Sequence, residues 1–534
     1  METIQTPKHL LSSWTESSVF GKMDIWTSLC LGIVLLGVFA AVPNMRKPSR
    51  KLPCLNPRQS LDLFDQNRKK TFLSTARNLL ERGRKQYPGQ LYRLMTDVGE
   101  AVIIPSEFVH DIRNEPDLSF MRAFADNFHP QLPGFEAFAA GDRDDGLFQL
   151  VIKKRITQLL NQITEPLSSE AKFAVDLLFG TSNQWREFNI KDDALDLISR
   201  LSSRVFLGAE VCRDEAWLSI TKSHTVNSFA AAEIVRIYPY WLRGLAHWFM
   251  PQCRALRQQV EDTRRIIEPI LQQRRDMRRQ AEAQNEPTPR FNDGLDWFEE
   301  ESKGHKYDAA GAQLGLSVVA IHTTTDLLVE TMLRIAQHPE LFQALRKEIV
   351  EVLSVDGWKK TALFNMKLAD SVLKETQRLK PVTLAPMIRV ATQPVTLPNG
   401  LQLQKGERCV ADIGKMIDSA VYDNPDEFDG YRFVNMRGSP GQDSQAHLVS
   451  TSPSHLGFGH GQHACPGRFF AANELKIALA HLLMKYDWKL TPGYEHRWEE
   501  YGFFCSSDRT AKVLMRRREA PEMDIDSLQV SFEG

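Results

Sequence analysis

The chain has 534 residues, with 66 lysines and arginines against 67 aspartates and glutamates, so its formal net charge is −1. This balance excludes the bulk electrostatic affinity for nucleic acid that a strongly basic protein has. Hydrophobic residues make up 42% and charged residues 25%, as in an ordinary globular protein with a large core. The seven cysteines are scattered without a C-x-x-C. That pattern excludes a disulfide framework, a thioredoxin-type motif and the usual paired-cysteine zinc sites.

The first element in chain order is an uncharged, mostly apolar run at 25–45. As a helix, its 21 residues match the hydrocarbon core of a bilayer, about 30 Å thick. Four basic residues follow within 46–51, and the positive-inside rule then places the rest of the chain in the cytosol. We therefore expect a short lumenal segment at 1–24, a transmembrane helix at 25–45 and a basic, proline-rich connector at 46–58. A cleaved signal peptide and a buried core helix are the alternatives for 25–45.

The rest of the chain is predicted to be mainly α with a minor β region, an α+β fold. Apolar spacing predicts helices at 60–86, over much of 147–280, at 308–338, from there to Pro381, and at 469–486. Turn residues predict one hairpin around 97–99 and another at Asn399-Gly400. The stretch 272–290 is predicted to be a solvated, charged connector, and 438–454 a polar loop. No βαβ alternation supports a Rossmann domain.

A glycine-rich stretch at 458–467 carries the strongest chemical signal. It sets Phe458, Gly459, Gly461 and Gly467 around a single Cys465, just before a predicted helix. Glycine lets the backbone approach a bulky planar ligand, and a helix amino terminus stabilises a thiolate. A lone thiolate in that setting suits one axial bond to a metal ion. The alternative for any single cysteine is an inert buried thiol.

This stretch resembles the haem loop of the cytochrome P-450 family of haem-thiolate monooxygenases, Phe-x-x-Gly-x-x-x-Cys-x-Gly. The resemblance implies a cytochrome P-450 fold over a haem-binding domain at 59–517, followed by a polar tail at 518–534. It also implies haem b (iron protoporphyrin IX) as the cofactor, with Cys465 as the axial ligand of the haem iron. Phe458, Gly459, Gly461 and Gly467 are then cofactor-binding residues of the same loop.

The resemblance further implies three side chains that bind the haem propionates. His463 stands two residues before the cysteine, where most members have an arginine, and Arg389 matches the family's arginine on the strand after the Glu-x-x-Arg helix. The third is Lys153, with Arg155 as the alternative, although the family's Trp-x-x-x-Arg is absent from this region.

A second family element is the Glu-x-x-Arg pair Glu375 and Arg378, ninety residues before Cys465. The family completes it with an arginine that Arg432 matches, and the implied role is a buried ion network that supports the haem pocket. The spacing alone is not specific. The same spacing occurs, for example, at Glu81/Arg84, Glu210/Arg213 and Glu261/Arg264, where we expect exposed helix pairs.

A third element lies in the predicted helix at 308–338, where Ala320-Ile321-His322-Thr323-Thr324 resembles the family pattern Ala/Gly-Gly-x-Asp/Glu-Thr-Thr. The resemblance implies Thr323, with His322 and Thr324, as the catalytic residues that deliver protons during oxygen activation. His322 departs from the pattern, because an acid is usual there. The alternative for Thr323 is a hydroxyl bonded back to the carbonyl four residues earlier.

Apolar residues also fall in the regions that the family uses to contact substrate, although core packing is the default for any one of them. Together they predict a large apolar pocket. The candidate pocket residues are Phe120, Phe124, Ala320, Val382, Phe503 and Phe504, with Phe128, Phe135 and Phe138 in the same covering region.

The function implied is a monooxygenase that inserts one oxygen atom from O2 into a hydrophobic small molecule, by hydroxylation or successive oxidations. The motifs look like those of fungal secondary-metabolism members, which suggests a terpenoid-like substrate. Electrons would come from NADPH through a separate FAD/FMN enzyme, NADPH-cytochrome P-450 reductase, with cytochrome b5 as a further candidate donor. The expected location is the endoplasmic reticulum membrane, single-pass in the lipid bilayer, with the catalytic domain cytosolic.

Three alternatives stay open at this point. One is a haem-thiolate isomerase or dehydratase that needs neither O2 nor a reductase. Another is a non-catalytic haem sensor or carrier. The third is a zinc protein that uses His455, His460, His463 and Cys465, whose spacing a metal ion tolerates.

Overall fold

The structure is a computed structural model that describes residues 52–58, 62, 65–143 and 145–528. The predicted segment 1–24, the predicted transmembrane helix 25–45 and the basic cluster 46–51 lie outside the described residues. Within the described residues, one helix, α13 (Ala309–Gln337), is long and apolar enough to cross a membrane, but 78% of its most apolar window is buried inside the protein. It is a core helix.

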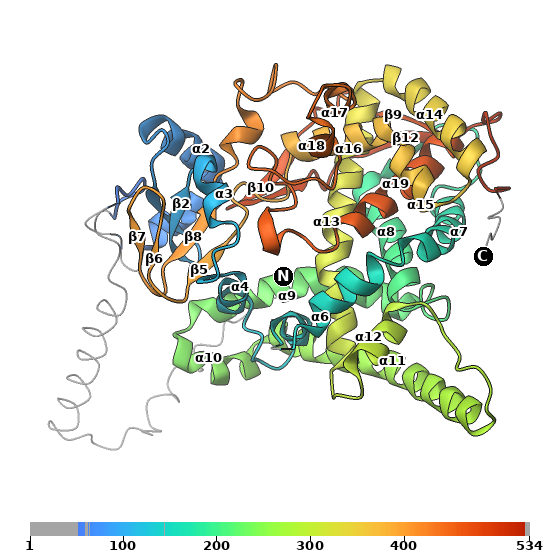
Figure 1. Cartoon of the computed structure of the whole chain (residues 1–534), viewed down its shortest axis with the longest axis horizontal. Helices are drawn as coiled ribbons and strands as arrows, with labels where there is room; N and C mark the ends of the chain where they lie inside the picture. Colours follow the sequence, from blue (N-terminus) through green and yellow to red (C-terminus); the bar gives the residue numbers. More distant parts are fainter. Residues whose placement is uncertain (1–51, 59–61, 63–64, 144, 529–534) are drawn as a thin grey trace, which may run out of the picture. The chain divides into compact units, whose positions relative to one another are not determined.

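Helices make up most of the body (Figure 1). Short 3-10 turns and one π-helical turn, η5 (Val151–Ile156), connect several of them. The 3-10 turns are η3 (Ser106–Phe108), η4 (Ala140–Asp142), η6 (His247–Phe249), η7 (Gly414–Ile417) and η8 (Gly461–His463). The other α-helices are α2 (Gln66–Gln86), α3 (Val109–Ile112), α4 (Phe120–Phe128), α5 (Glu136–Ala139), α6 (Leu147–Leu150), α7 (Leu160–Phe179), α8 (Ile190–Phe206), α9 (Glu215–Ile237), α10 (Tyr240–Ala246), α11 (Pro251–Ala283), α12 (Gly294–Ser302), α14 (Glu340–Asp356), α15 (Lys360–Asn365), α16 (Lys367–Leu379), α17 (Arg432–Arg437), α18 (Asp443–Ala446) and α19 (Arg468–Lys485).

The largest sheet has five strands in the order β1-β2-β8-β5-β3. Its hairpin pairs Thr96 with Gly99, and β2 runs parallel to β8 although all the other pairings are antiparallel. The strands are β1 (Tyr92–Thr96), β2 (Gly99–Ile104), β3 (Leu118–Ser119), β5 (Arg389–Ala391) and β8 (Arg408–Ala411). This sheet and α2 enclose a small apolar core of their own, distinct from the large core among the helices.

Three smaller sheets complete the β region. A β6–β7 hairpin turns at Asn399-Gly400, a three-stranded sheet has the order β4-β12-β9, and β10 pairs with β11. Their strands are β4 (Arg186–Asn189), β6 (Val395–Thr396), β7 (Gln402–Leu403), β9 (Tyr486–Leu490), β10 (Trp498–Tyr501), β11 (Phe504–Ser507) and β12 (Lys512–Arg517).

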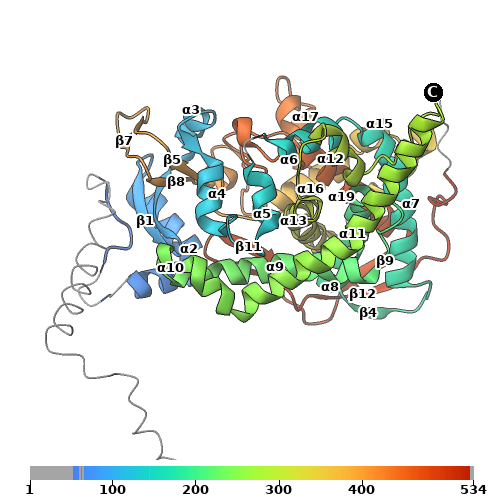
Figure 2. The same ribbon diagram turned by 90° about the horizontal axis from the view of Figure 1, so that it is seen from below.

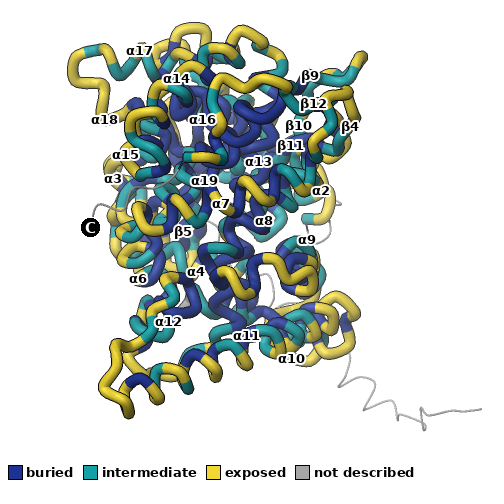
Figure 3. The backbone as a smooth tube through the Cα atoms, turned by 90° about the vertical axis from the view of Figure 1, so that its right-hand side faces the viewer, coloured by how far each residue is buried: buried dark blue, intermediate teal, exposed yellow. Residues whose placement is uncertain are grey.

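α13 is the organising element of the large core. Asp308 caps its amino terminus, accepting a hydrogen bond from the Gly311 backbone N–H at 3.1 Å. Figure 2 looks nearly along its axis, with α5, α8 and α16 around it, and all three pack against it. The burial map agrees: α8, α13 and α16 are largely dark blue, whereas α11 carries long exposed stretches (Figure 3). Residues on α13 are therefore held in a rigid setting.

The mainly helical body with a small sheet part, both predicted hairpins and the long helix at 308–338 are confirmed. The predicted connector at 272–290 is wrong over its first half, because α11 continues to Ala283. Its charges are held by tertiary partners: Arg274 binds Asp293 at 2.8 Å and Arg275 binds Glu299 at 2.7 Å. The polar loop at 438–454 also contains a short helix, α18.

Candidate active site

The glycine-rich loop turns sharply before α19. The Cys465 backbone N–H donates to the Phe458 carbonyl at 2.8 Å, which closes the turn. Gly461 has a φ of +81°, and an added Cβ there would meet the Arg113 carbonyl at 2.7 Å. A left-handed conformation together with so close a backbone excludes any side chain at this position. The loop thereby presents Cys465 at the start of α19.

The Cys465 thiol is desolvated although its side chain is accessible. Its side chain is accessible, yet burial is the largest influence on its pKa, which burial raises. Desolvation therefore describes the chemistry of this thiol better than its accessibility does. The backbone N–H of Gly467, the Arg468 guanidinium and the Arg468 N–H lower the same pKa. They stabilise negative charge on the sulfur, as expected at a helix amino terminus.

Three basic side chains from distant parts of the chain, those of Lys153, Arg389 and His463, gather near this loop. The pKa of His463 is lowered by burial and then by the charges of Arg389 and Lys153. Arg389 is 3% exposed, and burial lowers its pKa to about 10. Its guanidinium lies 5.7 Å from the centre of the Phe120 ring. Among the described residues, neither Arg389 nor Lys153 has a carboxylate partner. The cluster therefore lacks an anion.

The structure also separates Lys153 from its sequence alternative. Arg155 binds Glu301 at 2.6 Å, and Lys154 binds the same carboxylate at 2.8 Å. The π-helical turn that carries all three turns Lys153 alone toward His463. Arg155 is therefore held by its ion pair with Glu301 of α12.

These residues fit a haem. A haem takes one axial thiolate and carries anionic propionates on one edge. Cys465 is a desolvated thiol with amide donors aimed at it. Arg389 and Lys153 supply positive charge without a carboxylate partner among the described residues, and His463 adds a ring N–H donor beside them. The group would hold the propionate edge, and Cys465 the iron.

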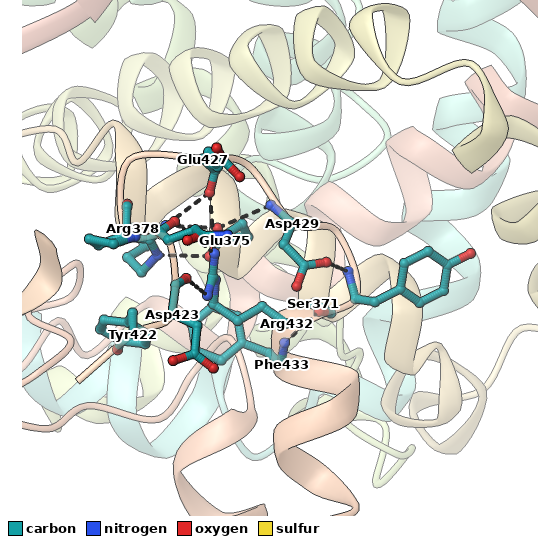
Figure 4. Close-up of polar contacts among 12 residues, drawn as sticks. Ser371, Glu375, Arg378, Tyr422, Asp423, Glu427, Asp429, Arg432 and Phe433 are labelled. Carbon is teal, nitrogen blue, oxygen red and sulfur yellow. Dashed lines mark hydrogen bonds and ion pairs between the residues drawn. The ribbon is translucent and has the colours of Figure 1, made fainter. Parts of the chain in front are cut away.

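Glu375 and Arg378 form the buried centre of an ion network that includes Arg432 (Figure 4). Arg378 forms two parallel bonds of 2.8 Å with the Glu375 carboxylate, and both side chains are 0% exposed. Arg432 donates to Glu375 at 3.0 Å. The other Arg378 N–H groups reach the Met416 and Pro425 carbonyls, each at 2.7 Å. The network therefore ties α16 to the segment that leads into the haem loop.

The other Glu-x-x-Arg spacings behave differently. Glu261 and Arg264 lie 3.8 Å apart on an exposed face of α11, as predicted, although Arg264 also binds Asp308 at 2.9 Å. In the remaining two pairs the arginine binds a carboxylate elsewhere: Arg84 binds Asp412 and Arg213 binds Glu170. The prediction of exposed helix pairs is wrong for these, because tertiary partners outcompete the neighbour on the helix.

One strip of α13 is exposed although the rest of the helix is buried. It contains Val319, which is 49% exposed, and the exposed Thr323, with the half-buried Ala320 beside them. The Thr323 hydroxyl donates back to the Val319 carbonyl at 3.0 Å, so the alternative foreseen for this residue exists in the structure. An exposed hydroxyl remains free to exchange that bond for a ligand. Thr324 is 4% exposed and points into the core instead.

His322 points away from the exposed strip. Its Nε2 lies 3.0 Å from the Lys222 carbonyl of α9. Because a carbonyl only accepts, Nε2 carries the proton and Nδ1 is the acceptor in the neutral ring. Burial lowers its pKa, and the charges of Lys191 and Arg509 lower it further. The ring therefore joins α13 to α9.

Phenylalanines from four elements, α4, α5, α9 and β11, form one aromatic group. Phe124 of α4 lies 4.9 Å from Phe128, which stacks on Phe138 at 4.6 Å. Phe229 of α9 packs on Phe128 at 5.0 Å and lies 6.1 Å from Phe504 of β11. The sequence predictions missed Phe229, because no local pattern marks it. Phe120 joins the group through Phe124 at 5.7 Å, and Phe135 is fully buried.

Phe503 and Phe504, both predicted to line the substrate pocket, lie in different environments. Phe504 is 53% exposed, whereas Phe503 packs edge-on against Phe72 at 4.8 Å in the small core. Val382 is fixed beside them, since its carbonyl accepts the Cys505 N–H at 2.9 Å. A separate cavity of about 130 Å³ near the start of α13 contains none of these residues.

The zinc alternative finds no site. Among the residues that the structure describes, no group of three or more histidine, cysteine, aspartate or glutamate side chains is placed to hold a metal ion. The Nε2 atom of His455 is occupied elsewhere, 3.0 Å from the Gln377 side-chain oxygen in the core.

Comparison with known proteins decides the family. The family model described as cytochrome P-450 matches residues 84–511. The chain belongs to the cytochrome P-450 family. Cytochrome P-450 monooxygenase eqxH of Fusarium heterosporum is 45% identical over 505 residues, covering 94% of this chain and 97% of the relative. Cytochrome P-450 monooxygenase hepE of Aspergillus oryzae is 42% identical, covering 95% and 93%.

The fold has a counterpart among solved structures. The crystal structure of the cytochrome P-450DA haem domain covers 88% of this chain and 98% of its own, with a TM-score of 0.67 and 16% identity. This cytochrome P-450 is a haem-thiolate monooxygenase, an oxidoreductase that uses haem and O2 and takes electrons from a redox partner.

Proposed function

We propose that this cytochrome P-450 hydroxylates, or oxidises in successive steps, a terpenoid-like scaffold in fungal secondary metabolism. The observation that carries the proposal is the exposed strip of α13, where Val319 and Ala320 flank a single accessible hydroxyl, that of Thr323. Phe504 and the aromatic group joined to it through Phe229 provide further apolar surface. Surfaces of this kind bind hydrophobic molecules and orient them with few polar contacts.

The chain's own residues have separable tasks in this reaction. The haem, when bound, supplies O2 activation. Cys465 holds the iron, and Arg389, His463 and Lys153 fix the propionate edge. The apolar residues exclude water and orient the substrate, and the Thr323 hydroxyl relays protons. One oxygen atom enters the substrate and the other leaves as water, so each turnover takes up two electrons and two protons.

The electrons are proposed to come from NADPH through a membrane-bound NADPH-cytochrome P-450 reductase, with cytochrome b5 as a second donor. The proposed location is the endoplasmic reticulum membrane, with an anchor at 25–45. Its support is the uncharged 21-residue run and an exposed aromatic surface at α10 and η6. There Tyr240, Trp241 and Phe249 are each 76% exposed, a composition that favours the lipid–water interface.

The test is product analysis with the full chain, its reductase and a panel of terpenoid scaffolds under isotopically labelled O2. We expect one labelled oxygen atom in each hydroxylated product, formed only with NADPH. Turnover without O2 and NADPH would favour the isomerase or dehydratase alternative instead. NADPH oxidation that no scaffold stimulates would favour a haem carrier or sensor.

A further inference from the structure

A buried charge cluster surrounds Asp326, one helical turn after His322 on α13. Its carboxylate accepts hydrogen bonds from Lys191 of α8 at 2.8 Å and from Lys380 at the end of α16. From β11, the Ser507 backbone N–H donates at 2.7 Å and its hydroxyl at 3.0 Å. One carboxylate is thus shared by two ammonium groups from two other helices.

The side-chain exposure falls across the cluster, from Lys191 through Asp326 to Lys380. The Lys191 side chain is 16% exposed and that of Asp326 8%, whereas that of Lys380 is 1% exposed. Burial, then Arg509, lowers the pKa of Lys191 to about 8. Burial, then Lys191, lowers that of Lys380 to about 7. Burial therefore makes both lysines weaker bases than an ordinary surface lysine, which favours release of their protons.

Asp326 lies beside Thr323 on the helix. Residues three and four apart on a helix are neighbours, with Cβ atoms about 5–6 Å apart. Asp326 is three residues after Thr323 and four after His322. His322 itself is tied to α9 through the Lys222 carbonyl. The nearest carboxylate to Thr323 along this face is thus one turn beyond the position where the family pattern places its acid.

We propose that Asp326, supplied by Lys191 and Lys380, delivers protons to the Thr323 hydroxyl in place of the acid that His322 replaces. The proposal rests on the proposed monooxygenase function, because that reaction takes up two protons per turnover. Asp326 acts through Thr323 and is a positioning and proton-supplying residue.

The proton balance is simple. A lysine N–H bond breaks and an O–H bond forms on the Asp326 carboxyl. A bridging water would carry the proton from the Asp326 carboxyl to the Thr323 oxygen, which accepts it as it gives its own proton to the pocket. Lys191 then recovers a proton from solvent, so one proton enters for each proton delivered and no electrons move.

Other charged groups around the cluster shape its pH dependence. Arg509 disfavours the protonated form of Lys191, and three carboxylates favour it. The Cys505 thiol raises the pKa of Lys380, and the charge of Lys191 lowers the pKa of His322. The three carboxylates are Glu499 of β10, Glu330 of α13 and Asp192 of α8.

The chain offers a matched control in Asp370 of α16. This carboxylate is also buried, binds Lys476 and Arg437 at 2.5 Å each, and accepts a backbone N–H from Leu448 at 2.7 Å. It has the same architecture, a carboxylate shared by two cations and an amide, but on another helix. Asp326→Asn and Asp370→Asn therefore lose similar interactions, the first on α13 and the second on α16.

The first experiment compares both variants in the haem-loaded full chain with reductase and substrate. We expect Asp326→Asn to cut product formed per NADPH at least tenfold, to release the balance as peroxide, and to raise the solvent deuterium isotope effect. Asp370→Asn should keep the wild-type coupling even where its melting temperature falls. Equal coupling in the two variants would overturn the proposal. If the wild type inserts no labelled oxygen into any substrate, the proposed function fails, whatever the variants do.

A second variant covers the case in which Asp326→Asn does not fold. Lys191→Arg keeps the positive charge but cannot release a proton, because the guanidinium stays protonated. We expect it to load haem as the wild type does and yet to lose coupling. Wild-type coupling in Lys191→Arg would overturn the entry of protons at Lys191.

Thermal unfolding gives a readout without turnover. Asp326→Asn leaves two ammonium groups facing each other, so its loss of melting temperature should be larger at pH 6 than at pH 9. A loss that does not depend on pH would show that the lysines do not titrate, and would also overturn the proposal.

Discussion

Removing the charge of Glu375 should destabilise this cytochrome P-450 far more than the same change in an exposed pair. In Glu375→Gln, Arg378 remains 0% exposed and loses two charge-assisted bonds of 2.8 Å. Arg432, 11% exposed, loses its partner as well. An uncompensated buried charge of this kind costs about 3–5 kcal/mol. Glu261→Gln breaks the exposed pair with Arg264, which has the same spacing, and should cost about 0.2–1 kcal/mol.

The assay is chemical unfolding of both variants, together with the fraction of purified chain that carries haem. We expect Glu375→Gln to lower the unfolding free energy by at least 2 kcal/mol more than Glu261→Gln, in line with the difference between buried and exposed pairs. Its haem content should fall too, because the network anchors the segment that leads into the haem loop. Equal losses in the two variants would refute the reasoning from burial.

Three further changes test other parts of the site. Glu474 of α19 is buried with one carboxylate oxygen unbonded, and its pKa is raised from 4.5 to about 8. Since the native state then binds the extra proton, stability falls as pH rises through this window. Glu474→Gln should remove the fall and gain on the order of 4 kcal/mol at its upper end; unfolding profiles that stay parallel across pH would contradict this. Arg389→Met should speed haem loss to a scavenging globin roughly tenfold or more, the worth of one charge-assisted bond, and an unchanged rate would count against the propionate role. Thr323→Ala should release more peroxide per NADPH, whereas Thr325→Ala, which loses the same bond to a carbonyl four residues earlier, should not; no difference between them would argue against proton delivery by Thr323.

Local patterns were sufficient for the regular elements. Asn399-Gly400 determines a hairpin from two residues, and the uninterrupted apolar spacing before His338 determines α13. The sequence predicted a connector where α11 continues because its charges find partners only in the folded protein, such as Asp293 for Arg274. Strand β4 was missed for the same reason, since it pairs with β12, more than 300 residues away.

In the candidate site, too, local patterns identified some residues, whereas others depend on distant partners. Motif spacing selected Cys465, and the structure brings Glu375, Arg378 and Arg432 together as one network. No local pattern distinguishes Lys153 from Arg155, because the choice depends on Glu301 of α12. The roles of Asp326 and Phe229 depend on partners that distant elements bring to them, and such partners are invisible along the chain.

The identity of the iron ligand is the central claim, and the spectrum of the reduced, CO-bound protein tests it most directly. The wild type should show the red-shifted Soret band that thiolate ligation produces. Cys465→Ala should lose that band, whereas Cys505→Ala, which removes another buried free thiol, should keep it. A red-shifted band that persists in Cys465→Ala would contradict the account.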